Sequence, residues 1–177
     1  MTIKSTFLAS VTFSFALVGT AYAADISKQD VIEAQKTWGQ GIVDIATMHT
    51  KGEDFKARAS EHVKSLYAYG ATDVMFKPTL AAKDQFRENF DEALSYFIGT
   101  EGTEDSGFAI KGWTNVRWEN NGIYTNHDSA MAMGNYFFTD PAGKEVKVEY
   151  TFGYVKDASG ALKINLHHSS LPYSPDK

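Results

Sequence analysis

Two polar side chains at the end of an apolar strand pattern are the strongest candidates for chemistry in this sequence. Leu162, Ile164 and Leu166 alternate with polar residues, so we expect them to share the inner face of a strand. Continued alternation places His168 and Ser170 on that same face. Because buried polar groups nearly always have partners, an inward imidazole and hydroxyl predict the wall of a polar pocket. The alternative is a strand end whose polar residues are solvated.

The histidines do not form a short metal-binding motif. His167 and His168 are neighbours on a strand and should point to opposite faces, so His167 is predicted on the surface or in a dimer contact. His49, His62 and His127 show no spacing of the kind that zinc sites favour. With no cysteine in the chain, thiolate ligands and cysteine nucleophiles are excluded. A metal site assembled from distant parts of the chain stays open as an alternative.

Helical periodicity predicts three helices in the first half of the chain. Ser27 and Asp30 are typical of a helix start, with the acidic group near the positive end of the helix dipole. Pro78 ends a short strand before the third helix, because proline lacks a backbone donor. We predict helices at 27–51, 54–69 and 82–97, with the short strand at 74–76.

A period of two replaces the helical pattern in the second half. We predict strands at 113–119, 129–139, 145–155 and 162–170, separated by turn signals at 120–122, 140–143 and 157–160. Three helices followed by an antiparallel meander predict an α+β architecture in which helices cover one face of a curved sheet. A pocket is expected at the open end of such a cone. This is the plan of the nuclear-transport-factor-2-like, or SnoaL-like, fold.

The first 23 residues have the features of a secretory signal peptide. Lys4 precedes an apolar run at 7–18, and Ala21-Tyr22-Ala23 gives the small-x-small pattern of a cleavage site before Ala24. The apolar run is short for a membrane span. We therefore expect a single domain at 24–177 that is periplasmic or secreted and is not held in a membrane after cleavage.

The charge balance argues against two classes of partner. The chain carries 17 basic and 22 acidic residues, a formal net charge of −5. An acidic chain is a poor ligand for nucleic acid or for an anionic membrane surface. Aromatic residues make up 14% of the chain, which is enough to line a broad apolar cavity around a small molecule.

Four segments resemble the iota-class carbonic anhydrases. They are Asp73-Val74-Met75-Phe76-Lys77-Pro78-Thr79, the stretches 133–138 and 148–154, and His167-His168-Ser169-Ser170-Leu171-Pro172. Typical members carry a third histidine ahead of the pair, where this chain has Leu166. The resemblance implies interconversion of CO2 and bicarbonate without a metal, with zinc as the alternative cofactor. A homodimer formed through the sheet is the expected assembly of this architecture.

Carried over to this sequence, the resemblance implies a pocket made by Thr79, Tyr96, His168 and Ser170. Hydroxyls of Thr79, Tyr96 and Ser170 would hold the three oxygens of bicarbonate without a fixed positive charge. A neutral His168 would take the proton of the attacking water, directly or through Ser170. Thr79 is also a natural residue for the start of the third helix.

Two other functions fit the same fold. Cones of this kind also serve as isomerases, cyclases or hydratases on larger organic substrates, with an inward carboxylate or histidine as base. The predicted strands place no convincing carboxylate inward, since Glu149 lies opposite the apolar set. The other function is a non-catalytic periplasmic binding or association module, which has little need of an inward His168 and Ser170.

Overall fold

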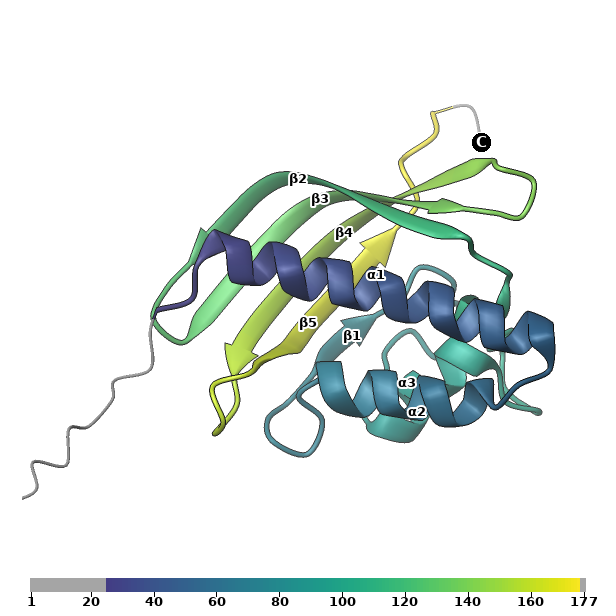
Figure 1. Ribbon diagram of the computed structural model, residues 1–177, viewed down its shortest axis with the longest axis horizontal. Helices are drawn as coiled ribbons and strands as arrows, with labels where there is room; N and C mark the ends of the chain where they lie inside the picture. The colour runs from purple at the N-terminus through teal and green to yellow at the C-terminus, as the bar shows by residue number, and fades with distance from the viewer. Residues whose placement is uncertain (1–24, 176–177) are drawn as a thin grey trace, which may run out of the picture.

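Three helices and a five-stranded sheet make up the part of the chain that the structure describes, residues 25–175 of a computed structural model. The predicted signal peptide at 1–23 lies outside these residues. Figure 1 shows the longest helix lying across one face of the sheet, with the two shorter helices beside it. The elements are α1 Lys28–Lys51, α2 Phe55–Leu66, β1 Met75–Lys77, α3 Phe90–Ile98, η1 Phe108–Ile110, β2 Asn115–Thr125, β3 Ser129–Thr139, β4 Glu145–Lys156 and β5 Leu162–Ser170.

The sheet has the strand order β1-β5-β4-β3-β2. Strands β2 to β5 are antiparallel neighbours along the chain, and β1 pairs in parallel with β5. The long strands alternate as predicted, because Val148, Tyr150 and Phe152 of β4 are buried against the helices. The predicted α+β architecture is confirmed, with the helices on the inner face of a curved sheet (Figure 1).

The first helix begins and ends where its sequence signals are. Ser27 and Asp30 form a reciprocal capping box, and Gly52 closes the helix in the left-handed conformation that glycine adopts without strain. In the middle of α1, Trp38 is fully buried and meets rings from α3 and from four strands. Trp38 is therefore the centre of the core between α1 and the sheet.

The third helix is shorter than the sequence predicts. It was expected at 82–97, but it begins at Phe90, with Asn89 as its capping residue. Residues 82–89 are not helical because their backbone groups have other partners: the Glu104 carboxylate accepts from the N–H groups of 82–84, and the Arg87 side chain donates to two nearby carbonyls. Phe86 is accordingly 52% exposed and lies outside the core.

The turn predicted at 120–122 is also corrected. Those residues form a bulge inside β2, where the pairing with β3 shifts between Asn120 and Gly122. Gly134 on β3 makes the bulge feasible, because a Cβ there would lie 2.1 Å from the Glu119 carbonyl oxygen. The strand therefore continues to Thr125, and the chain reverses at 126–128.

A second bulge changes the phase of β5. Tyr154 pairs with Ile164 and Gly153 pairs with Leu166, so Asn165 is the extra residue on β5. Because strand side chains alternate, one extra residue moves every later side chain to the opposite face. From this point to its end, β5 presents its odd-numbered residues to the helices.

Candidate active site

A cavity of about 240 Å³ lies between the helices and the inner face of the sheet. Most of its wall is aromatic or aliphatic. The polar side chains come from the segment after β1, from α3, from the residue after η1, and from strands β3 and β5. The residues that line the cavity are Trp38, Thr79, Leu80, Tyr96, Phe97, Phe108, Lys111, Trp113, Tyr136, Phe138, Val146, Val148, His167, Ser169 and Leu171.

The structure brings together two of the four predicted site residues and replaces the other two by their neighbours. Thr79 and Tyr96 line the cavity as expected. The inward orientation predicted for His168 and Ser170 is wrong: His168 is exposed, and Ser170 donates a hydrogen bond to Glu149 on the outer face.

The inward residues of β5 are His167 and Ser169, which are 3% and 4% exposed. The expectation that His167 lies at the surface is therefore also wrong. The cause is the bulge at Asn165, which strict alternation from Ile164 did not include. One signal for it was present in the sequence, because Gly153 inside a strand pattern often marks a bulge or a close backbone approach.

A chain of hydrogen bonds fixes the imidazole of His167. The Trp38 Nε1–H donates to the Tyr67 hydroxyl oxygen over 3.0 Å, and that hydroxyl lies 2.8 Å from His167 Nδ1. The Tyr67 hydroxyl has one hydrogen to donate, and Nδ1 is the acceptor within reach. His167 is therefore assigned the tautomer that carries its hydrogen on Nε2.

Burial keeps the His167 imidazole neutral. It stacks on Phe76 with ring centroids 4.5 Å apart and is shielded from solvent. Desolvation holds the pKa of His167 well below its usual range, and repulsion from His168 and His62 lowers that pKa further. A proton is consequently not stored on this ring at neutral pH.

Three hydroxyls continue the polar wall from His167. Its Nε2 lies 3.4 Å from the Tyr136 hydroxyl, a long contact, and Tyr136 hydrogen-bonds with Ser169. Ser169 accepts a hydrogen bond of 2.9 Å from the Thr79 hydroxyl. Burial is the main cause that raises the pKa of Tyr136, so this phenol stays protonated. Thr79 thereby joins the segment after β1 to the end of β5.

Tyr96 approaches the cavity from α3. Burial raises the pKa of Tyr96 to about 12, although hydrogen bonds from the backbone of Leu80 and Thr79 act in the opposite direction. Its ring stacks on Phe108, with centroids 5.7 Å apart. The phenol is therefore a neutral, oriented donor, and we find no acceptor for its hydrogen within residues 25–175.

Charge is scarce around the cavity. Lys111 is the charged residue among those that line it, and its ammonium group donates to the Ser106 carbonyl over 3.0 Å. No carboxylate lines the cavity within the described chain, so the inward carboxylate base of an isomerase is missing there. Across residues 25–175, no group of three His, Cys, Asp or Glu side chains could hold a metal ion.

The sequence matches the family model described as metal-independent carbonic anhydrase over residues 29–171. A metal-independent carbonic anhydrase from Nostoc sp. strain PCC 7120 is 40% identical over 153 residues, which cover 84% of this chain and 75% of that relative. This chain belongs to the metal-independent carbonic anhydrase family. The predicted enzyme class, a carbonic anhydrase that interconverts CO2 and bicarbonate, is confirmed, and the metal-free assignment agrees with the family.

Solved structures agree with this carbonic anhydrase assignment. The iota-carbonic anhydrase of a cyanobacterium, crystallised with bicarbonate, has a TM-score of 0.82 and 37% identity, covering 85% of this chain and 94% of that one. A nuclear-transport-factor-2-like protein from Salmonella enterica has a TM-score of 0.52 at 13% identity, covering 84% of this chain and 92% of that one. At that identity the second match shows the fold alone, and it confirms the predicted fold class.

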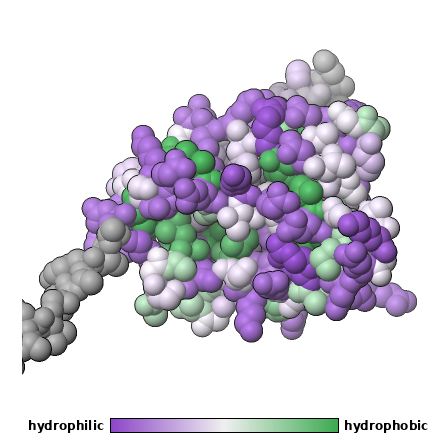
Figure 2. Space-filling model, viewed as in Figure 1, coloured by the Kyte–Doolittle hydropathy of each residue, from purple (hydrophilic) through white to green (hydrophobic). Residues whose placement is uncertain are grey.

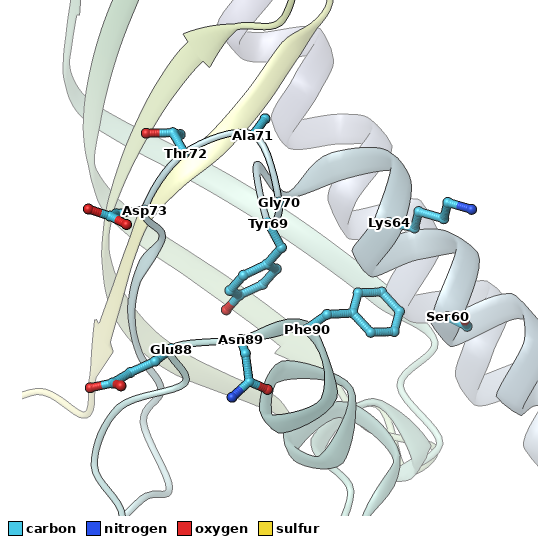
Figure 3. A pocket seen from close by; sticks show the side chains of 10 residues that line it. All are labelled: Ser60, Lys64, Tyr69, Gly70, Ala71, Thr72, Asp73, Glu88, Asn89 and Phe90. Atoms are coloured by element: carbon cyan, nitrogen blue, oxygen red, sulfur yellow. The ribbon is translucent and has the colours of Figure 1, made fainter.

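A larger hollow on the surface is a weaker candidate for the active site of a carbonic anhydrase, because the tyrosine hydroxyl at its centre already has a partner. Figure 3 shows it between α2 and the chain around 70–73 and 88–90, with Tyr69 and Phe90 at its centre. The Tyr69 hydroxyl is already used, because it donates to the Arg87 carbonyl over 2.7 Å.

Figure 2 shows that the helix-bearing face is mostly hydrophilic, with small hydrophobic patches. None of the helices within residues 25–175 is long and apolar enough to cross a membrane.

Proposed function

We propose that this carbonic anhydrase hydrates CO2 in the cavity between α1, α3 and β5, with Thr79, Tyr96 and Ser169 as its binding hydroxyls. The observation that carries the proposal is that these three hydroxyl-bearing residues line one cavity, with Thr79 and Ser169 hydrogen-bonded to each other, and that most of its other walls are aromatic or aliphatic. Apolar walls suit CO2, while the hydroxyls suit the oxygens of bicarbonate. The bicarbonate complex of the cyanobacterial relative supports this choice of ligand.

Neutral donors hold the anion in this proposal. Ser169 accepts from Thr79, and Tyr96 accepts from the backbone, so each oxygen is fixed by a protein donor. The hydrogens of Ser169 and Tyr96 are then available to bicarbonate, while Thr79, whose hydrogen goes to Ser169, can accept from the O–H of bicarbonate. In a cavity with little water, hydrogen bonds to a developing anion are stronger than in solution, and they need no reorganisation as charge appears on the oxygens of CO2.

The reaction joins water to CO2 and releases one proton. The water oxygen attacks carbon, one O–H bond of the water breaks, and bicarbonate forms. His167 is a poor place for that proton, because its pKa is depressed and its Nε2 already carries a hydrogen. We assign His167 the task of orienting Tyr136 and Ser169, and the proton passes through the cavity mouth to solvent or buffer. Hydration should therefore accelerate as buffer concentration rises.

Neighbouring serines on β5 give a matched test of this site. In stopped-flow CO2 hydration by residues 24–177, Ser169→Ala should lower kcat/KM by about 10- to 100-fold, the value of one hydrogen bond to a charged group. Ser170→Ala removes the same hydroxyl from the outer face and should leave the rate unchanged. Equal rates for the two variants would refute the assignment of the cavity.

Chelation tests the metal-free part of the proposal in the same assay. The rate of the unmodified protein should survive exhaustive chelation, because in this proposal neutral hydroxyls, rather than a metal ion, hold the anion. A rate that chelation abolishes and zinc restores would contradict a metal-free site.

We further propose that the protein is a homodimer formed through the outer face of the sheet. Met131 and Met133 of β3 are 53% and 50% exposed there, and Phe137 lies along the same face. Adjacent apolar side chains on one strand gain from burial against a second copy. Analytical ultracentrifugation should give a dimer mass that Met133→Glu shifts towards the monomer. A monomeric unmodified protein would exclude this assembly.

We also propose export to the periplasm or outside the cell, with cleavage before Ala24. The support is the signal pattern of the first 23 residues. Mass spectrometry of protein recovered from the producing cells should find Ala24 as the N-terminal residue. An intact N-terminus on cytoplasmic protein would refute export.

A further inference from the structure

The segment that carries Thr79 has no regular secondary structure to hold it. Residues 78–89 run between β1 and α3 without helix or strand, although Thr79 and Leu80 line the cavity. Chain segments with few backbone hydrogen bonds of their own are usually mobile. The position of the Thr79 hydroxyl therefore depends on contacts made by residues further along this segment.

The carboxylate of Glu104 accepts hydrogen bonds from three consecutive backbone amides of that segment. Its two oxygens accept from the N–H groups of Ala82 and Lys83 over 3.0 Å and of Asp84 over 2.9 Å. These hydrogen bonds, that from Lys83 first, hold the pKa of Glu104 below its usual range. One anion with three converging donors forms a backbone nest. The segment is thus fixed three residues beyond Thr79.

The neighbouring residue Asp105 makes a second attachment through Arg87. The Arg87 side chain is 2% exposed, and its Nη2 lies 2.6 Å from Asp105 Oδ1. Asp105 also accepts a hydrogen bond of 2.7 Å from Ser95 on α3. Figure 3 shows Tyr69 pointing towards the chain at 88–89, where its hydroxyl holds the Arg87 carbonyl. The loop at 99–107 therefore ties the segment to α3.

Both attachments act on the same side of the cavity. The Arg87 guanidinium lies 5.8 Å from the centre of the Tyr96 ring, and the backbone of Leu80 and Thr79 hydrogen-bonds the Tyr96 hydroxyl. We infer that Glu104 is a positioning residue that holds Thr79 and Leu80 against Tyr96 from outside the cavity. This inference rests on the proposed function, because it concerns the hydroxyls assigned to bicarbonate.

The test compares two glutamates of one loop. Glu104→Gln replaces one acceptor oxygen by an amide that itself donates, so the three N–H groups are no longer all satisfied. Glu101→Gln is the matched control, since Glu101 is exposed and makes no hydrogen bond or ion pair within residues 25–175. Hydrogen exchange at amides 82–84 should be about tenfold faster in Glu104→Gln and unchanged in the control.

A double-mutant cycle with Thr79→Val separates positioning from general stability. Glu104→Gln alone should lower kcat/KM for CO2 hydration by about fivefold, and should add less than about twofold in the Thr79→Val background, because coupled residues are not additive. Fully additive losses would overturn positioning through Thr79, leaving a structural role. Unchanged hydrogen exchange at amides 82–84 would show that the Glu104 carboxylate does not hold this segment. If Thr79→Val kept the full rate, Thr79 would be excluded as a bicarbonate-binding hydroxyl of the proposed function. The exchange rates would still decide whether Glu104 holds the segment.

Discussion

His167 differs from a usual catalytic histidine because every neighbour favours its neutral form. Phe76 stacks on one face, Tyr67 donates to Nδ1, and the residues around the ring exclude water. A histidine that acts as a general base normally titrates near the working pH, whereas the pKa of this one lies well below it. We therefore regard its contribution as orientation of the hydroxyls beside it.

Nitrogen-15 NMR tests the protonation state of His167 directly. The ring should show the neutral form with hydrogen on Nε2 from pH 8 down to pH 5, because protonating it inside the core costs more than protonating a solvated imidazole. A His167 signal that titrates near pH 6.5 would contradict the assigned orienting role and would instead support His167 as the general base.

At the scale of elements, the bulge of β5 decides which side chains reach the cavity. Asn165 is the extra residue, and Gly153 on β4 lies opposite it. A Cβ on Gly153 would lie 2.9 Å from Leu166 Cβ and 3.0 Å from the Asn165 side-chain oxygen. The absence of a side chain at 153 thus lets the bulge pack against β4. The bulge in turn places His167 opposite Phe152.

Gly153→Ala should therefore destabilise the protein and lower its activity together. We expect the free energy of unfolding in urea to fall by about 1–3 kcal/mol, the usual cost of overpacking, and kcat/KM to fall as His167 shifts. Gly122→Ala is the matched control, because Gly122 is also a strand glycine and a Cβ there would meet no atom within 4 Å. Similar stability of the two variants would show that Gly153 is not required by the bulge.

At the scale of the whole molecule, the core contains two buried histidines that must stay neutral. His62 of α2 packs against Trp38 and Phe97, and a Cβ on Gly41 would lie 2.1 Å from its Nδ1. Burial lowers the pKa of His62 to about 3, with repulsion from Arg58 as the next cause. With His167, these rings couple the stability of the fold to pH.

The protein should lose stability as pH falls below about 6.5. In that range the unfolded chain takes up protons on both histidines and the folded chain does not, so stability rises with pH. Each histidine contributes a slope of about 1.4 kcal/mol per pH unit. Urea unfolding between pH 6.5 and 4.5 measures the sum. His62→Leu should remove one histidine's share of the slope. A stability independent of pH in this range would contradict burial of both rings.

Local signals in the sequence determined the elements that begin and end by their own chemistry. Ser27 and Gly52 bound α1 as predicted, and the alternation of β4 placed its aromatic side chains inward, because caps and periodicity act over a few residues. The fold class and the family followed from these elements and from the motifs. Thr79 was found from the motif at 73–79, and Tyr96 was inferred from the resemblance to the family.

Only the tertiary structure decided the phase of β5 and the course of residues 82–89. Asn165 forms a bulge because Gly153 on the neighbouring strand has no side chain to obstruct it. Residues 82–89 are not helical because the Glu104 carboxylate accepts hydrogen bonds from their amides. Both partners are distant in sequence, so no local pattern shows either contact, although Gly153 by itself indicates an irregularity in its strand. The sequence by itself therefore determined that the end of β5 carries the site, and long-range contacts decided that His167 and Ser169 are the side chains that enter it.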